Sequence, residues 1–99
     1  MIKIKLKNGY IAYKIKTTEL MKIGGWGVCD YCNKAETVGY LIPVLNHWYC
    51  KECFNDWLRT SRFYPDDKPF ENRNCKYYEH LIKVEKEVRE EECDIFDSL

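Results

Sequence analysis

Two pairs of cysteines constrain the fold of this 99-residue chain more than any other feature. The first pair is Cys29 and Cys32, the second is Cys50 and Cys53, and seventeen residues separate the two pairs. Two C-x-x-C pairs at this distance are typical of a zinc site with four thiolate ligands, because each pair can wrap one side of the metal. We therefore predict that these four cysteines bind one structural zinc ion.

A site of this kind supports a fold rather than a reaction. Four thiolates form a closed tetrahedral shell without an open position for water, so we expect no metal-activated hydroxide. In peptides such zinc binding contributes about 10–16 kcal/mol, more than the whole stability of a typical small domain. Iron in a rubredoxin-like site is the main alternative. We favour zinc, because the second pair opens a predicted helix, whereas rubredoxin-type sites use two matching knuckles.

The first seventeen residues predict a β-hairpin. Apolar and lysine side chains alternate strictly over residues 2–7, which is the pattern of a half-buried strand. Asn8-Gly9 follows, and both residues tolerate the positive φ that a two-residue type I′ turn requires. The return strand covers residues 10–16. We interpret the exposed lysines mainly as a charged edge that discourages aggregation.

Residues 28–63 predict a knuckle, two strands and a helix in that order. The strands cover residues 37–42 and 47–50, with a turn at Pro43 to Asn46. A helix then follows to about Phe63, because three apolar residues recur at i, i+3 and i+4 from Phe54. Cys53 falls in its first turn, where the helix dipole favours a thiolate.

This order resembles the treble-clef zinc fold, a large group that includes LIM-type and GATA-type fingers. The residues that carry the resemblance are the four cysteines together with Trp48, Tyr49, Phe54 and Trp57. The resemblance covers about a third of the chain. It implies a metal-built scaffold that binds nucleic acid, a protein or a small molecule, or that only holds a fold together.

Residues 76–93 predict a C-terminal amphipathic helix. Its apolar stripe recurs at steps of four, three and four residues, through Tyr77, Leu81, Val84 and Val88. The preceding residues 64–74 contain Pro65 and Pro69, so we expect a loop there. The acidic run 90–92 opposes the dipole at a helix C-terminus, and we expect that end to fray unless the basic hairpin holds it.

Together these segments predict an α+β fold in a single domain, residues 1–99. Chains divide into several domains only well beyond this length. The apolar content of 45% predicts a packed globule rather than disorder. The expected parts are the N-terminal β-hairpin (1–17), the zinc module (28–63) and the C-terminal helix (76–93).

Three other residues have side chains of the kinds found in functional sites. His47 precedes Cys50 by three residues, but four cysteines already complete the shell, so we expect it to hydrogen-bond in the hairpin or face solvent. His80 stands alone on the predicted helix and receives no role. Trp26 lies between Gly25 and Gly27, and we expect it to cap the zinc site or the core; stacking on a ligand is the alternative.

Two further cysteines flank the predicted C-terminal helix. Cys75 and Cys93 are eighteen residues apart. A continuous helix would separate them by about 27 Å, which is too far for a disulfide. We therefore interpret both as small buried or half-buried side chains.

Charge is balanced overall but unevenly spread. Residues 1–26 carry six lysines and one glutamate, a net charge of +5, and residues 79–99 carry three cations and eight acids, a net charge of −5. Such asymmetry can mark a basic binding face and an acidic tail. The alternative is that the two ends are neighbours and neutralise each other.

We predict a non-catalytic binding module that docks a protein as an adaptor or inhibitor, because net charge is zero and aromatic residues are abundant. The alternative is nucleic-acid binding through the lysine-rich hairpin and Lys51, Arg59 and Arg62, which fall close to one helix face. The chain has no phosphate loop or hydrolase motif, so we expect no enzyme.

The expected location is the cytoplasm. The N-terminus alternates charge and has no apolar signal-peptide core, and no run approaches the ~18 apolar residues of a membrane span. We expect no membrane partner, and the oligomeric state stays open. Rich lysine, isoleucine, asparagine and tyrosine content suggests an AT-rich bacterial or phage genome.

Overall fold

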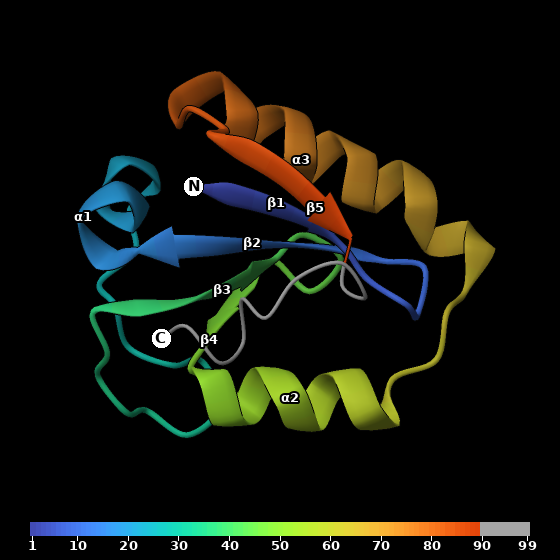
Figure 1. Ribbon diagram of the computed structural model, residues 1–99, viewed down its shortest axis with the longest axis horizontal. Coiled ribbons are helices and arrows are strands. Elements are labelled where there is room, and N and C mark those ends of the chain that lie inside the picture. The colour runs from blue at the N-terminus through green and yellow to red at the C-terminus, as the bar shows by residue number, and fades with distance from the viewer. Residues whose placement is uncertain (90–99) are drawn as a thin grey trace.

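The computed structural model describes residues 1–89, which form a mixed α+β fold with one five-stranded sheet. The strands are β1 (Ile2–Lys5), β2 (Ile11–Lys16), β3 (Val38–Ile42), β4 (His47–Tyr49) and β5 (Lys86–Arg89). The helices are α1 (Thr17–Leu20), α2 (Lys51–Thr60) and α3 (Lys68–Leu81), with 3-10 turns η1 (Met21–Ile23) and η2 (Pro65–Asp67). The sheet order is β4-β3-β2-β1-β5 (Figure 1). Neighbouring strands are antiparallel except β1 and β5, which are parallel.

The N-terminal hairpin and the cysteine-containing segment share this sheet. Strand β2 pairs with β1 on one side and with β3 on the other, and Tyr13 lies opposite both Lys3 and Leu41. The predicted hairpin is therefore confirmed, and so are the two strands of the predicted zinc module. No local pattern in the sequence indicated that the two parts would pair.

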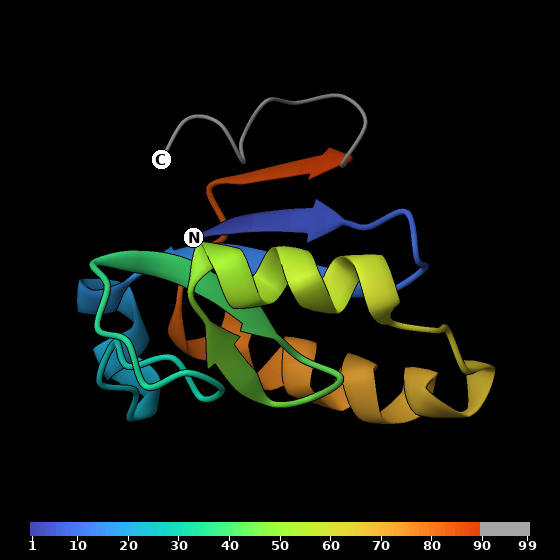
Figure 2. The ribbon, with the colours of Figure 1, turned by 90° about the horizontal axis from the view of Figure 1, so that it is seen from below.

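The two longer helices cover opposite faces of the sheet. Tyr13 lies opposite Leu41, and successive residues of a strand point to opposite sides, so Tyr13 and Tyr40 lie on different faces. On one face, Phe54 of α2 stacks on Tyr40, with ring centroids 4.2 Å apart. On the other face, Tyr78 of α3 meets the ring of Tyr13 edge-on at 6.0 Å. All four rings are buried. Figure 1 shows α3 and α2 on opposite sides of the strands, and Figure 2 shows α2 crossing in front of the sheet.

The turn of the first hairpin differs from the predicted type I′ turn. Leu6 and Tyr10 still pair, because the Leu6 N–H donates to the Tyr10 carbonyl oxygen at 2.9 Å. The loop therefore has three residues, and only Gly9 in it has a positive φ, of 95°. Asn8 instead accepts the Tyr10 N–H with its side-chain oxygen at 3.0 Å. The hydrogen bond from the Asn8 side chain thus stabilises the turn in place of the second residue of positive φ that a type I′ turn would have.

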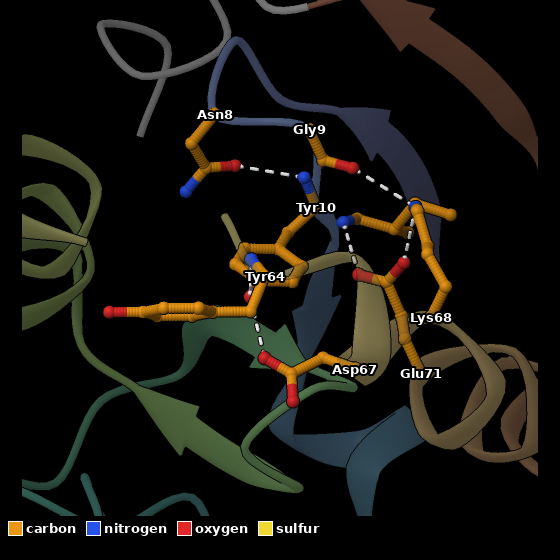
Figure 3. Close-up of polar contacts among 8 residues, drawn as sticks. Asn8, Gly9, Tyr10, Tyr64, Asp67, Lys68 and Glu71 are labelled. Atoms are coloured by element: carbon orange, nitrogen blue, oxygen red, sulfur yellow. Dashed lines mark hydrogen bonds and ion pairs between the residues drawn. The ribbon is translucent and has the colours of Figure 1, made fainter. Parts of the chain in front are cut away.

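A polar cluster fastens this turn to α3 (Figure 3). The Lys68 ammonium donates to the Gly9 carbonyl oxygen at 3.0 Å and lies 2.6 Å from a carboxylate oxygen of Glu71. The other Glu71 oxygen accepts the Ile11 N–H at 2.8 Å. Strand β3 pairs with β2 only from Tyr13 onward, so Glu71 takes the place of a neighbouring strand at Ile11.

The predicted C-terminal helix over residues 76–93 is confirmed only for residues 76–81 and is wrong for residues 82–89. Helix α3 covers Lys68–Leu81, where a loop was predicted up to residue 74, and Lys86–Arg89 is strand β5. Of the predicted apolar stripe, Tyr77 and Leu81 are exposed, while Val84 and Val88 lie beyond the helix. Residues 90–93 of the predicted helix lie outside the described residues.

Three physical causes explain the difference. Pro69 sits in the first turn of α3, where a missing N–H removes no helical hydrogen bond. The buried face of α3 includes Glu71, which no apolar periodicity can reveal. Strand β5 forms because β1 offers an open edge, and this long-range pairing places Val88 beside Ile4.

The two oppositely charged ends of the chain are neighbours within the described residues. Lys3 of β1 lies beside Glu87 of β5, with the Lys3 ammonium 4.0 Å from a Glu87 carboxylate oxygen. The same ammonium lies 2.9 Å from a Glu79 carboxylate oxygen on α3. These contacts support the interpretation that the ends neutralise each other at this point. Among residues 1–89, no helix is both long and apolar enough to cross a membrane.

Candidate metal centre

The structure brings the four predicted ligands together. The Sγ atoms of Cys29, Cys32, Cys50 and Cys53 all lie within 4.8 Å of one another, so the four side chains could hold a metal ion. Cys32 Sγ lies 3.7 Å from Cys50 Sγ. Metal–sulfur bonds of about 2.3 Å in a tetrahedron separate neighbouring sulfurs by about 3.8 Å, whereas a disulfide would bring them to about 2.05 Å. The spacing therefore fits thiolates that share one ion.

A tight turn presents the first pair. An isolated bridge between Val28 and Ala35 closes the loop. Inside it, the Cys29 N–H donates to the Lys34 carbonyl oxygen and the Asn33 N–H donates to the Cys29 carbonyl oxygen, both at 2.9 Å. Asn33 has a φ of 65°, a left-handed conformation that asparagine tolerates better than most residues. These contacts form the knuckle that the sequence predicts.

The start of α2 presents the second pair. Cys50 is the N-cap residue, and its carbonyl oxygen accepts the Phe54 N–H at 2.9 Å. Cys53 lies in the first turn, as predicted. The Phe54 ring stacks on Tyr40 of β3, so the sheet fixes the position of the helix start. The helix ends at Thr60, three residues before the predicted end.

Asp30 ties the knuckle to β4, a role that the sequence analysis missed. Its carboxylate accepts the Trp48 N–H at 2.8 Å, and its own N–H donates to the Trp48 carbonyl oxygen at 2.9 Å. Trp48 lies two residues before Cys50. This link therefore brings the two cysteine pairs face to face. A short acidic side chain directly after the first cysteine was the available signal, since aspartate readily binds nearby backbone groups.

The surroundings of Cys29 favour its thiolate. Burial alone would raise its pKa, but backbone N–H groups of Cys32, Cys50 and Tyr31 point at its sulfur and lower the pKa to about 7. Burial, followed by the neighbouring thiols, raises the pKa of Cys53, so the helix dipole does not dominate there. Burial likewise raises the pKa of Cys50. A bound cation would stabilise all four thiolates.

No protein-family model matches the chain, and neither a curated protein nor a solved structure matches it. The centre is therefore defined by the chain's own geometry. Four sulfurs, a tight turn at the first pair, a helix start at the second and an aspartate that joins them define it.

The other candidate residues lie apart from the cysteines. His47 is exposed, and its Nδ1 atom lies 3.5 Å from the Tyr49 hydroxyl oxygen, which agrees with a place in the hairpin rather than among the ligands. His80 is exposed in the last turn of α3. Cys75 is buried on the inner face of the same helix, as predicted for a small core side chain. Cys93 lies outside the described residues.

Trp26 does not cap the site or the core, and that prediction is wrong. Its side chain is 81% exposed. The nearby core position is filled by Leu20, which packs so closely on Gly25 that a Cβ there would lie 2.3 Å from it. Tyr31, inside the knuckle, is 74% exposed, and Val28 is exposed as well. We call Trp26, Val28 and Tyr31 the knuckle surface.

Proposed function

We propose that the four cysteines bind one zinc ion that is structural rather than catalytic. Zinc suits a four-sulfur tetrahedral site. The second pair lies at a helix start, unlike the two matching knuckles of a rubredoxin-type site. The order of knuckle, paired strands and helix supports a treble-clef arrangement of residues 28–63. Four thiolates leave the ion no position for water, so no hydrolytic role follows.

We further propose that the zinc-built scaffold docks a protein partner, as an adaptor or inhibitor. The main support for this proposal is the exposure of two aromatic side chains within three residues of Cys29. Trp26 is 81% exposed and Tyr31 is 74% exposed. Tryptophan and tyrosine are common anchors of protein interfaces. The Tyr31 ring contacts the Tyr49 ring edge-on, with ring centroids 6.2 Å apart, and this contact supports the Tyr31 side chain. A rigid support of this kind lowers the entropy cost of binding. The location that suits reduced thiols is the cytoplasm.

The alternative of nucleic-acid binding is based in part on Lys51, Arg59 and Arg62 sharing one face of a helix, and the bounds of α2 weaken this argument. Helix α2 ends at Thr60, so Arg62 lies beyond it. Arg59 lies 2.6 Å from a carboxylate oxygen of Asp56 in the preceding turn. Lys51 sits at the opposite end of the helix.

Partner capture with two matched double variants tests the docking proposal. Trp26→Ala/Tyr31→Ala removes both anchors of the knuckle surface. Tyr64→Ala/Tyr77→Ala removes two rings of similar size that are 57% and 55% exposed elsewhere. Zinc content and circular dichroism confirm that each variant folds.

We expect the wild-type chain and the Tyr64/Tyr77 variant to recover the same nuclease-resistant partner, identified by mass spectrometry. The Trp26/Tyr31 variant should recover at least tenfold less of it, since loss of two anchors costs 2 kcal/mol or more in typical interfaces, about a 30-fold change. Equal recovery by all three proteins would contradict the proposal, as would a recovery that nuclease abolishes.

A further inference from the structure

The four cysteines of the candidate metal centre differ in their exposure to solvent. Cys29 and Cys50 are 0% and 2% exposed, and Cys53 is half-buried. Cys32 is the exposed member of the group. A small oxidant dissolved in water therefore reaches Cys32 before it reaches the other three cysteines.

The knuckle turn accounts for this difference within the first pair. Cys32 lies within a continuous exposed run, residues 30–37, and Cys29 directly precedes that run. The Cys29 N–H donates to the Lys34 carbonyl oxygen, and the Cys29 carbonyl oxygen accepts the Asn33 N–H. Both backbone groups of Cys29 are thus bonded inside the turn. One turn therefore holds the two cysteines of a pair in different environments, one buried and one exposed.

The Cys50 sulfur lies within short reach of Cys32. The two Sγ atoms are 3.7 Å apart, and a disulfide requires a separation of about 2.05 Å. Cys50 is the N-cap residue of α2, and the stacking of Phe54 on Tyr40 fixes this helix start on the sheet. Exposed turns move at a lower cost than packed elements. The closing movement therefore falls on the turn that carries Cys32.

Cys75 is a contrasting cysteine in the same chain. It is 6% exposed on the inner face of α3, and burial raises the pKa of its thiol. A buried thiol that stays protonated is inert, because the thiolate is the species that reacts with oxidants. At the metal centre a bound cation would instead keep the cysteines as thiolates, and Cys32 is the exposed one among them.

We propose that Cys32 is an oxidation site, at which a peroxide produces a disulfide between Cys32 and Cys50. The Cys32 thiolate attacks one oxygen of the peroxide, so that an S–O bond forms, the O–O bond breaks and hydroxide leaves. The Cys50 thiolate then attacks the sulfur of this sulfenic acid, which forms the S–S bond and expels the second oxygen as hydroxide. Two protons from the solvent convert both hydroxides into water. The two sulfurs lose two electrons, and the peroxide gains them.

Release of the metal follows from the loss of two of its four ligands. Cys29 and Cys53 alone cannot complete the tetrahedral shell that four thiolates provide. The disulfide thus converts the metal centre into a cross-link between the knuckle and the start of α2, and a dithiol reductant reverses the change. This release rests on the zinc ion proposed above, whereas the disulfide can be detected with or without zinc.

Tryptic mapping of the zinc-loaded full chain after treatment with hydrogen peroxide tests the proposal, because cleavage separates the cysteines well. Cleavage at lysine and arginine places the first cysteine pair in the peptide 23–34. Cys50 lies in the peptide 35–51, and Cys53 lies in the peptide 52–59. The remaining thiols are alkylated before digestion, and a zinc-sensitive dye records the metal that leaves the protein.

We expect the main disulfide to join the peptides 23–34 and 35–51, and fragmentation between Cys29 and Cys32 to assign it to Cys32. One zinc ion per chain should leave at the rate at which the disulfide forms. A main disulfide between any other two cysteines would overturn the proposal, as would zinc release without a disulfide. The zinc content measured before peroxide is added tests the proposed zinc site separately.

Two matched ligand variants test the role of the exposed sulfur. Cys32→His and Cys53→His each leave three cysteines and one histidine, a donor set that also binds zinc tetrahedrally. The Cys32→His variant lacks the exposed thiolate, and it should lose zinc at least about tenfold more slowly than Cys53→His, which keeps both sulfurs of the proposed disulfide. Equal rates of zinc loss in the two variants would refute the role of Cys32.

The control variant Cys75→Ser/Cys93→Ser removes the two cysteines outside the metal centre. It should form the same disulfide as the wild-type chain and release zinc at the same rate. Loss of the disulfide in this variant would assign the oxidation to Cys75 or Cys93 and would contradict the proposal.

Discussion

Two ion pairs of equal length show how burial decides the contribution of a residue to stability. Lys68–Glu71 and Arg59–Asp56 both span three positions of a helix, and both have a nitrogen–oxygen distance of 2.6 Å. Glu71 is fully buried and also accepts the Ile11 N–H, whereas Asp56 is 66% exposed. Water can replace the partner of Asp56 but not that of the Ile11 N–H.

We therefore expect Glu71→Ala to lower the free energy of unfolding by about 1–3 kcal/mol, because it leaves the partly buried Ile11 N–H without its acceptor. Asp56→Ala is the matched control and should change the free energy of unfolding by no more than about 0.5 kcal/mol. Urea unfolding of the zinc-loaded proteins measures both. Equal losses in the two variants would show that Glu71 does not act as the structure indicates.

At the scale of elements, residue spacing in the sequence predicted the elements that form through interactions between neighbouring residues. The two cysteines of a C-x-x-C pair lie close together because the turn between them is short. Strict alternation over residues 2–7 predicts a strand whichever strand it pairs with. Helix α3 and strand β5 were missed because their causes are distant. Glu71 accepts the Ile11 N–H on the side where β3 does not reach Ile11, and β5 pairs with the edge that β1 leaves open.

A single proline distinguishes the observed α3 from the predicted helix. If a helix began at residue 76, proline at that position would be tolerated in its first turn. In the structure Lys76 is exposed in the middle of α3, where proline removes a hydrogen bond and clashes with the preceding turn.

Lys76→Pro should therefore lower the free energy of unfolding by about 3 kcal/mol or more. A mid-helix alanine at the same position, Lys76→Ala, is the matched control and should change it by less than about 0.5 kcal/mol. Chemical denaturation of both variants provides the comparison. A proline variant as stable as the alanine variant would place the helix boundary elsewhere.

At the scale of the whole molecule, one sheet couples the metal centre to the rest of the described chain. Strand β3 leads from the knuckle toward β4 and the second cysteine pair, and it also pairs with β2 of the N-terminal hairpin. Metal loss should therefore disturb the hairpin as well as residues 28–63. The sequence indicated that the four cysteines would lie together, as they do. It held no sign of this strand pairing, which depends on contacts between distant segments.

Native mass spectrometry of the purified chain tests the central claim most directly, because one spectrum reports both the bound metal and the compactness of the protein. We predict a compact, low-charge species that carries one zinc ion per chain, and a metal-free species found only at the high charge states of an unfolded chain, since zinc binding in such sites is coupled to folding. A compact metal-free chain, or a compact chain that carries iron, would contradict the account.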